Sequence, residues 1–219
     1  MITPLAFLFD LDGTLLDTAP EFTYCLNKLL AQQGKENVTV KAMRSSVSFG
    51  AKGMLSFGFK VHTDDPIINS LLPEFLRLYQ HEIGLRTQFF PGMEEILLHL
   101  GKKGLSWGIV TNKPLNFTTE LVKMFKPLQA AKCVVAGDSL PFQKPDPAPL
   151  LHAAAMLETA PQDCWYIGDA KTDLMASRKA NMRCAIANYG YIPPDEDPFA
   201  WNADSYLAQP LDIEKLLLV

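Results

Sequence analysis

The stretch LAFLFDLDGT, residues 5–14, decides the fold. Its first five residues are apolar without polar alternation, and a run of this length is typical of a strand covered on both faces. Asp10 and Asp12 follow at once, so we expect both carboxylates at the carboxyl end of that strand, where open α/β sheets place their ligands. Gly13 then allows the backbone to turn sharply.

Strand and helix patterns alternate through most of the remaining chain. Further apolar runs occupy residues 105–111, 133–136, 164–168 and 183–187, and helical patterns occupy 93–103, 116–125, 147–157 and 172–181. Strands that alternate with helices indicate βαβ units and a parallel sheet. The sequence therefore predicts an α/β core whose parallel sheet is flanked by helices.

Residues 19–83 break this alternation, because they offer helical patterns without a convincing buried strand between them. We expect an inserted all-helical module here, joined to the sheet domain by two hinge-like connections at residues 15–19 and 85–91. The predicted division is a core of residues 1–15 and 88–219 and a helical cap of residues 16–87.

Composition excludes several classes of protein. With 48% hydrophobic and 20% charged residues, the 219-residue chain has the balance of a globular protein and not of a disordered one. A net charge of −4 disfavours unspecific binding of nucleic acid, which depends on Lys and Arg. A few local cations still permit a small anionic substrate.

The cysteines and the hydropathy indicate a reducing, cytoplasmic setting. Cys25, Cys133, Cys164 and Cys184 lie far apart without a CxxC pair, so we expect buried thiols and no zinc site. The first residues lack the basic region of a secretory signal. No apolar run approaches the roughly 20 residues that cross a bilayer.

Paired carboxylates such as Asp10 and Asp12 can perform different tasks, one attacking as an anion and the other handling a proton. Alone, the pair could also be an acidic turn, since Asp and Gly are favoured in turns. Other polar residues favour a catalytic role for the pair, because each of them falls at the end of a predicted strand or in the loop beyond it. They are Thr111 with Asn112, Lys144 before a proline, Asp169 after a glycine, and Asp173.

In this order the motifs resemble those of the haloacid dehalogenase superfamily, which are matched by Asp10 and Asp12, Thr111, Lys144, and Asp169 with Asp173. The resemblance spans the whole chain. It implies a Rossmann-like core with a helical cap inserted after the first motif, in agreement with the helical stretch at residues 19–83.

The resemblance also implies a metal site. An anionic phosphate ester repels an attacking carboxylate, so positive charge must lie between them, and hard oxygen ligands suit Mg²⁺. The expected ligands are Asp10, the backbone carbonyl of Asp12, and Asp169, while Asp173 would orient the ligands that bind directly.

The implied mechanism uses each remaining motif. Asp10 would attack phosphorus and form an aspartyl-phosphate, while Asp12 would act first as acid and then as base. Lys144 would hold the nucleophile and a phosphate oxygen together. The Thr111 hydroxyl and the Asn112 backbone N–H would bind the transferring phosphoryl group.

Two positions favour a phosphatase within this superfamily. Asp12 argues against a dehalogenase, which needs no proton donor, and Thr14 is typical of phosphatases, whereas sugar phosphomutases usually carry Val there. A phosphomutase and a non-catalytic binding module remain alternatives. In the cap, Arg44 or Lys52 is a candidate for binding a substrate carboxylate, and either is equally typical of a surface cation.

Two branches of phosphatases are similar to this chain, and both imply a small phosphorylated metabolite as substrate. Residues 8–21 resemble phosphoglycolate phosphatases, which hydrolyse 2-phosphoglycolate. Residues 90–93, 110–114 and 189–198 resemble bacterial N-acetylmuramic acid 6-phosphate phosphatases. The sequence does not separate the two substrates, and it does not indicate an oligomeric state.

Overall fold

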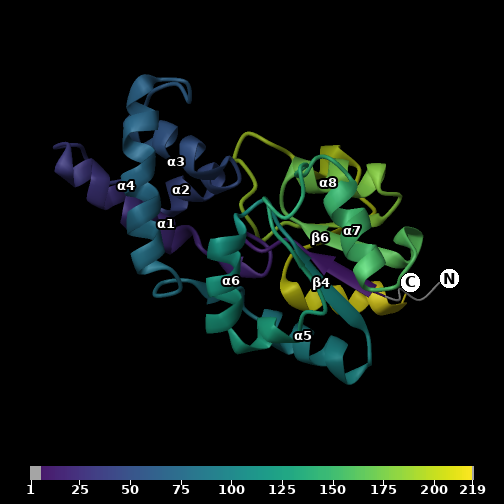
Figure 1. Ribbon diagram of the computed structural model, residues 1–219. Helices are drawn as coiled ribbons and strands as arrows, with labels where there is room; N and C mark the ends of the chain where they lie inside the picture. Colours follow the sequence, from purple (N-terminus) through teal and green to yellow (C-terminus); the bar gives the residue numbers. More distant parts are fainter. Residues whose placement is uncertain (1–5, 219) are drawn as a thin grey trace.

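A computed structural model describes residues 6–218, with only the backbone of the last of these (Figure 1). Leu5, the first residue of the predicted opening strand, lies outside the described residues.

Six strands of the described chain form one sheet in the order β5-β4-β1-β6-β7-β8, and every neighbouring pair is parallel. They are β1 (Ala6–Phe9), β4 (Ser106–Val110), β5 (Val134–Val135), β6 (Cys164–Gly168), β7 (Arg183–Ala187) and β8 (Ser205–Leu207). The predicted parallel sheet is confirmed, with β8 as an additional edge strand. The inner strand β1 is completely buried, which explains its unbroken run of apolar residues.

Helices cover both faces of the sheet. They are α5 (Met93–Lys102), α6 (Leu115–Met124), α7 (Ala148–Met156) and α8 (Lys171–Lys179), with 3₁₀ segments η1 (Lys126–Ala130), η2 (Pro161–Asp163), η3 (Pro198–Trp201) and η4 (Pro210–Leu218). Alternate residues of β1 serve the two faces: Phe7 and Phe9 pack with α5, α6 and η4, whereas Leu8 packs with α7 and α8. Both faces of the sheet are therefore buried against helices.

Four further helices lie to one side of the sheet, and we call them the cap (Figure 1). They are α1 (Ala19–Gln32), α2 (Val40–Val47), α3 (Gly50–Phe59) and α4 (Pro66–Glu82), so residues 19–83 contain no strand, as expected. Within the cap, Phe22 of α1 stacks on Tyr79 of α4 with ring centroids 4.4 Å apart. The buried side chains of the cap belong to the same apolar cluster as those on one face of the sheet.

A two-stranded antiparallel ribbon connects the cap to the sheet, formed by β2 (Leu16–Asp17) and β3 (Gln88–Phe89). The ribbon occupies the two connections that the sequence predicted as hinges, although strands were not expected there. Each helix among residues 6–218 is too short or too polar to span a membrane. The four cysteines are buried and unpaired, as expected.

Glu21 in the first turn of α1 ties the cap to the second connection. Its buried carboxylate accepts hydrogen bonds from the Gly84 N–H at 2.6 Å, the Arg86 N–H at 3.2 Å and the Thr87 hydroxyl at 3.1 Å. Burial raises the pKa of Glu21, and the three donors oppose that rise. One side chain thus satisfies the backbone of the segment that leads from α4 to β3.

We predict that Glu21→Ala lowers the free energy of unfolding by about 3 kcal/mol, because it leaves several buried donors without an acceptor. Chemical denaturation measures this loss. Glu120→Ala is the matched control: Glu120 is an exposed carboxylate on α6 that pairs with Lys123, and its loss should change stability by less than about 0.5 kcal/mol. Equal stability of the two variants would contradict the role of Glu21.

Candidate active site

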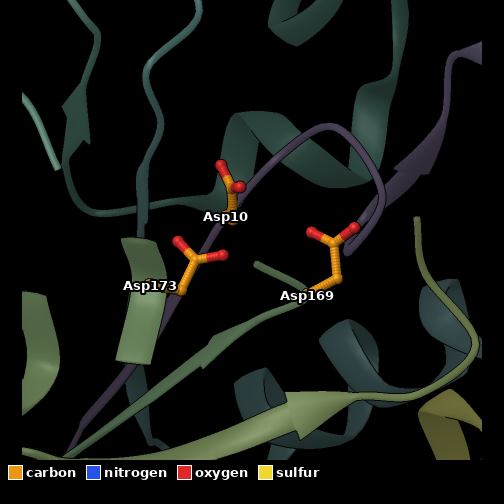
Figure 2. Close-up of side chains that lie close together, drawn as sticks. All are labelled: Asp10, Asp169 and Asp173. Atoms are coloured by element: carbon orange, nitrogen blue, oxygen red, sulfur yellow. The ribbon is translucent and has the colours of Figure 1, made fainter. Parts of the chain in front are cut away.

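Three carboxylates converge at the carboxyl end of the sheet (Figure 2). Asp10 follows β1, Asp169 follows β6 and Asp173 lies in the first turn of α8; one oxygen of each lies within 4.8 Å of the others. The parallel pairing of β1 with β6 aligns Phe9 with Ile167, so the two chains leave the sheet at the same edge. Asp169 and Asp173 are buried, and Asp10 is partly exposed.

Gly13 lets the loop after β1 fold over this cluster. Its φ of +83° lies in the left-handed region, and a β-carbon at this position would overlap the carboxylate of Asp169 and the ring of Tyr191. The position therefore requires glycine for both conformation and space. In the same loop, the Leu11 N–H donates to Asp10 Oδ1 at 2.7 Å and orients that carboxylate.

Lys144 supplies the positive charge within the cluster. Its side chain is 2% exposed, and its Nζ lies 3.1 Å from Asp10 Oδ1 and 2.7 Å from Asp173 Oδ1. The hydroxyl of Tyr166, on β6, lies 2.8 Å from the same nitrogen. The structure thus brings Lys144 to the predicted nucleophile.

Asn112 positions the loop that carries Lys144. Its side-chain amide donates to the Lys144 carbonyl at 2.9 Å, and its Oδ1 accepts from the Lys144 N–H at 3.0 Å. Sequence reasoning considered only the backbone N–H of Asn112, so this side-chain role is a new finding. Thr111 is buried beside it, and its hydroxyl oxygen accepts from the Lys113 N–H at 3.2 Å. Because the Thr111 oxygen is the acceptor in that bond, the hydroxyl can still donate its hydrogen to another group.

The two buried aspartates are held in different ways. Asp169 accepts from the Tyr191 N–H at 2.7 Å and from the Thr14 hydroxyl at 3.3 Å. Asp173 accepts from the Ala170 N–H at 2.9 Å, in addition to its bonds with the Lys144 ammonium and, at 3.0 Å, the Tyr166 hydroxyl. Both oxygens of Asp173 are therefore engaged, as suits a residue that orients its neighbours.

The cluster carries more negative than positive charge, because one lysine faces three carboxylates. Burial and the neighbouring carboxylates raise the pKa of Asp10 to about 6 against the opposing effect of Lys144. Burial and the charges of Asp10 and Asp173 raise the pKa of Asp169 well above its usual range. Hard oxygen donors with excess negative charge fit a divalent metal ion.

Asp12 is not among the three clustered carboxylates, and it pairs with Lys113. The Lys113 Nζ donates to both carboxylate oxygens of Asp12, at 3.1 and 3.0 Å, and the lysine side chain is 3% exposed. Lys113 was not among the site residues predicted from the sequence. The same reasoning that selected Thr111 and Asn112 at the end of a strand, extended by one residue, would have found it.

A cavity of about 550 Å³ separates the cluster from the cap. From the core, its walls include Asp10, Asp12, Thr111, Asn112, Lys113 and Lys144. From the cap, its walls include Phe22, Met54, Leu72, Phe75, Leu76 and Tyr79, which are apolar or aromatic. The core wall thus offers charge and hydrogen bonds, and the cap wall is mostly apolar, with Ser48 and Lys52 as polar members.

The two cap cations predicted as substrate ligands differ in position. Arg44 forms an ion pair with Asp17 in the ribbon, and Asp17 accepts from the Tyr191 hydroxyl at 2.8 Å. Of the described residues that line the cavity, Lys52 is one and Arg44 is not. Substrate binding by Arg44 or Lys52 stays a prediction, and of the two only Lys52 lines the cavity.

Solved structures share this architecture. A predicted phosphoglycolate phosphatase from Haemophilus somnus superposes with a TM-score of 0.86 at 22% identity and covers 99% of both chains. CbbY from Rhodobacter sphaeroides in complex with phosphate superposes with a TM-score of 0.77 at 20% identity and covers 100% of both chains. At these identities the likeness shows the fold alone.

Curated relatives are more similar in sequence. A phosphoglycolate phosphatase of Xanthomonas campestris pv. campestris is 40% identical over 94% of this chain and 93% of its own. An N-acetylmuramic acid 6-phosphate phosphatase of Pseudomonas putida is 35% identical over 97% of this chain and 95% of its own. The family model described as haloacid dehalogenase-like hydrolase matches residues 7–187, and the chain belongs to that family.

Proposed function

We propose that this chain is a Mg²⁺-dependent phosphatase that hydrolyses a small phosphate monoester through an aspartyl-phosphate on Asp10. The observation that carries the proposal is the convergence of Asp10, Asp169, Asp173 and Lys144, of which Asp10 and Lys144 line the cavity. Membership of the hydrolase family and the phosphatase names of the relatives support it.

The reaction has two displacements at phosphorus. In the first, a carboxylate oxygen of Asp10 bonds to phosphorus, the ester P–O bond breaks, and Asp12 gives its proton to the departing alkoxide. In the second, Asp12 takes a proton from water, the water oxygen bonds to phosphorus, and the bond to Asp10 breaks. Inorganic phosphate and the alcohol are the products, and both aspartates return to their starting states.

The metal would be held by Asp10, the backbone carbonyl of Asp12, and Asp169, with Asp173 orienting the site. When bound, Mg²⁺ shields the anionic ester from the anionic nucleophile. Lys144 lies 3.1 Å from Asp10, with its side chain 2% exposed, and adds a second positive charge at the nucleophile. Thr111 and Asn112, on the same wall of the cavity, would bind the phosphoryl oxygens.

The cap side of the cavity supports an organic group larger than two carbons. Its volume of about 550 Å³ lies in the range of pockets that enclose a whole metabolite. The apolar walls suit the acetyl and lactyl methyl groups of N-acetylmuramic acid 6-phosphate, and Lys52 could pair with its carboxylate. 2-Phosphoglycolate, the substrate in the names of other relatives, would leave most of the apolar wall without contact.

Two further assignments belong to this proposal. The core comprises residues 1–15 and 88–219 and the cap residues 16–87, which is supported by the ribbon of β2 and β3 at the boundary. The protein acts in the cytoplasm, which is supported by its four unpaired cysteines. A sugar phosphomutase and a non-catalytic binding module are the alternatives, and neither would release inorganic phosphate steadily from a simple ester.

We predict that Asp10→Asn lowers kcat by about a thousandfold or more, because an amide cannot form the covalent intermediate. Steady-state release of phosphate measures the loss, and mass spectrometry of the same sample excludes deamidation back to aspartate. Asp64→Asn is the control: Asp64 has 89% of its side chain exposed in a cap loop, and the variant should keep full activity. Turnover by pure Asp10→Asn at the wild-type rate would refute the nucleophile assignment.

We predict that chelation with EDTA abolishes turnover and that Mg²⁺ restores it. Mg²⁺ should also raise the melting temperature of the metal-free protein, because an ion that binds the folded state stabilises it. Asp169→Asn should lose this thermal shift, since it removes one ligand of the cluster. A thermal shift of the same size in wild type and Asp169→Asn would place the ion elsewhere.

We predict a kcat/KM for N-acetylmuramic acid 6-phosphate that exceeds the value for 2-phosphoglycolate by about tenfold or more, from apolar contact alone. Leu72→Trp, which narrows the apolar wall, should lower the value for the amino-sugar ester more than for the two-carbon ester. If the wild type preferred 2-phosphoglycolate, the substrate assignment would be wrong, and the phosphatase proposal would stand.

A further inference from the structure

Lys113 lies between the core and the cap. It follows β4 in the core, and its ammonium donates to both oxygens of Asp12 at 3.0 and 3.1 Å. The same nitrogen lies 4.7 Å from the ring centroid of Phe22 on α1 and 4.7 Å from that of Tyr79 on α4. Two cap rings and one core carboxylate thus enclose the ammonium.

This environment fixes the Asp12 side chain relative to Lys113. An ammonium with a side chain 3% exposed is unfavourable unless it is paired, and Asp12 and the two ring faces supply the pairing. The bond to both carboxylate oxygens restricts rotation of the Asp12 side chain. Because the rings belong to the cap, the enclosure is complete only where the cap contacts the core.

The two buried lysines of the site serve different carboxylates. Lys144 contacts Asp10 and Asp173, whereas Lys113 contacts Asp12. Lys144 is held by the core through Tyr166 and the Val110 carbonyl, whereas the surroundings of Lys113 include the cap. Only the second lysine therefore connects the cap with a residue that handles protons in the proposed mechanism.

We propose that Lys113 is a positioning residue that holds the Asp12 carboxylate in place for proton transfer, and that Phe22 and Tyr79 make this depend on contact between cap and core. The inference rests on the proposed phosphatase function. It differs from two other roles for Lys113: direct binding of the phosphoryl group, and an ion pair that serves stability alone.

Esters that differ in their leaving group separate these roles. 4-Nitrophenolate departs without a proton, whereas the alkoxide of β-glycerol phosphate needs one from Asp12. In Lys113→Met, kcat/KM for the alkyl ester should fall by about tenfold or more, and kcat/KM for the aryl ester by less than about threefold. Slower hydrolysis of the aspartyl-phosphate should also produce a burst of nitrophenolate.

Comparison variants tie the effect to Asp12. Asp12→Asn should show the same dependence on the leaving group, and Lys113→Met with Asp12→Asn should be no worse than Asp12→Asn alone. Lys113→Arg keeps the charge and should restore part of the alkyl-ester activity. Lys123→Met removes an exposed lysine of α6 and should behave as wild type toward both esters.

Tyr79 offers a matched pair that tests the contribution of the cap. Its buried hydroxyl has no hydrogen-bond partner within residues 6–218, so Tyr79→Phe keeps the ring and should leave the alkyl-to-aryl ratio unchanged. Tyr79→Leu removes the ring and should lower that ratio in the same direction as Lys113→Met. An alkyl-to-aryl ratio in Tyr79→Leu equal to that of the wild type would show that the cap does not contribute to the positioning of Asp12.

Equal losses on both esters in Lys113→Met would overturn the positioning role and favour binding of the phosphoryl group, and no loss on either ester would overturn it as well. Lys113→Arg supplies the same comparison if Lys113→Met does not fold, since a positioning role requires its alkyl-to-aryl ratio to exceed that of Asp12→Asn. Wild-type protein that hydrolyses neither ester with Mg²⁺ present would refute the phosphatase proposal itself, and the inference with it.

Discussion

Repulsion among three carboxylates within 4.8 Å of one another is the constraint on which the site depends. The parallel pairing of β1 with β6 creates it, because the chain segments that carry Asp10 and Asp169 must leave the sheet side by side. Lys144 offsets part of the charge, and Asn112 holds the loop that brings this lysine to the cluster. The remaining negative charge and the hard oxygen donors fit a divalent cation.

The cap adds a largely apolar wall to the cavity and two rings beside Lys113, the partner of Asp12. The core alone offers charge and hydrogen-bond donors, which recognise a phosphoryl group on any alcohol. Phe75, Leu72 and Met54 line the cavity on the cap side, and in the proposed function this wall distinguishes one alcohol from another. Phe22 and Tyr79 complete the surroundings of Lys113, so the same helices that line the cavity also contact the partner of Asp12.

The sequence predicted the features that depend on long or repeated patterns. Unbroken apolar runs identified the inner strands, and polar residues at their ends identified Asp10, Thr111, Lys144 and Asp169 as neighbours in space. The ribbon of β2 and β3 was missed because two residues a strand carry no periodicity. β8 was missed because it has three residues and packs at the sheet edge. The pairing of Arg44 with Asp17 joins residues from different elements, which no local pattern records.

The central claim is that phosphorus is displaced twice, first by Asp10 and then by water. The stereochemistry at phosphorus tests this most directly, with an isotopically chiral thiophosphate ester hydrolysed in heavy-oxygen water. Each in-line displacement inverts the configuration, so two displacements predict net retention. Net inversion would show a single displacement by water, and it would contradict the role of Asp10 as nucleophile.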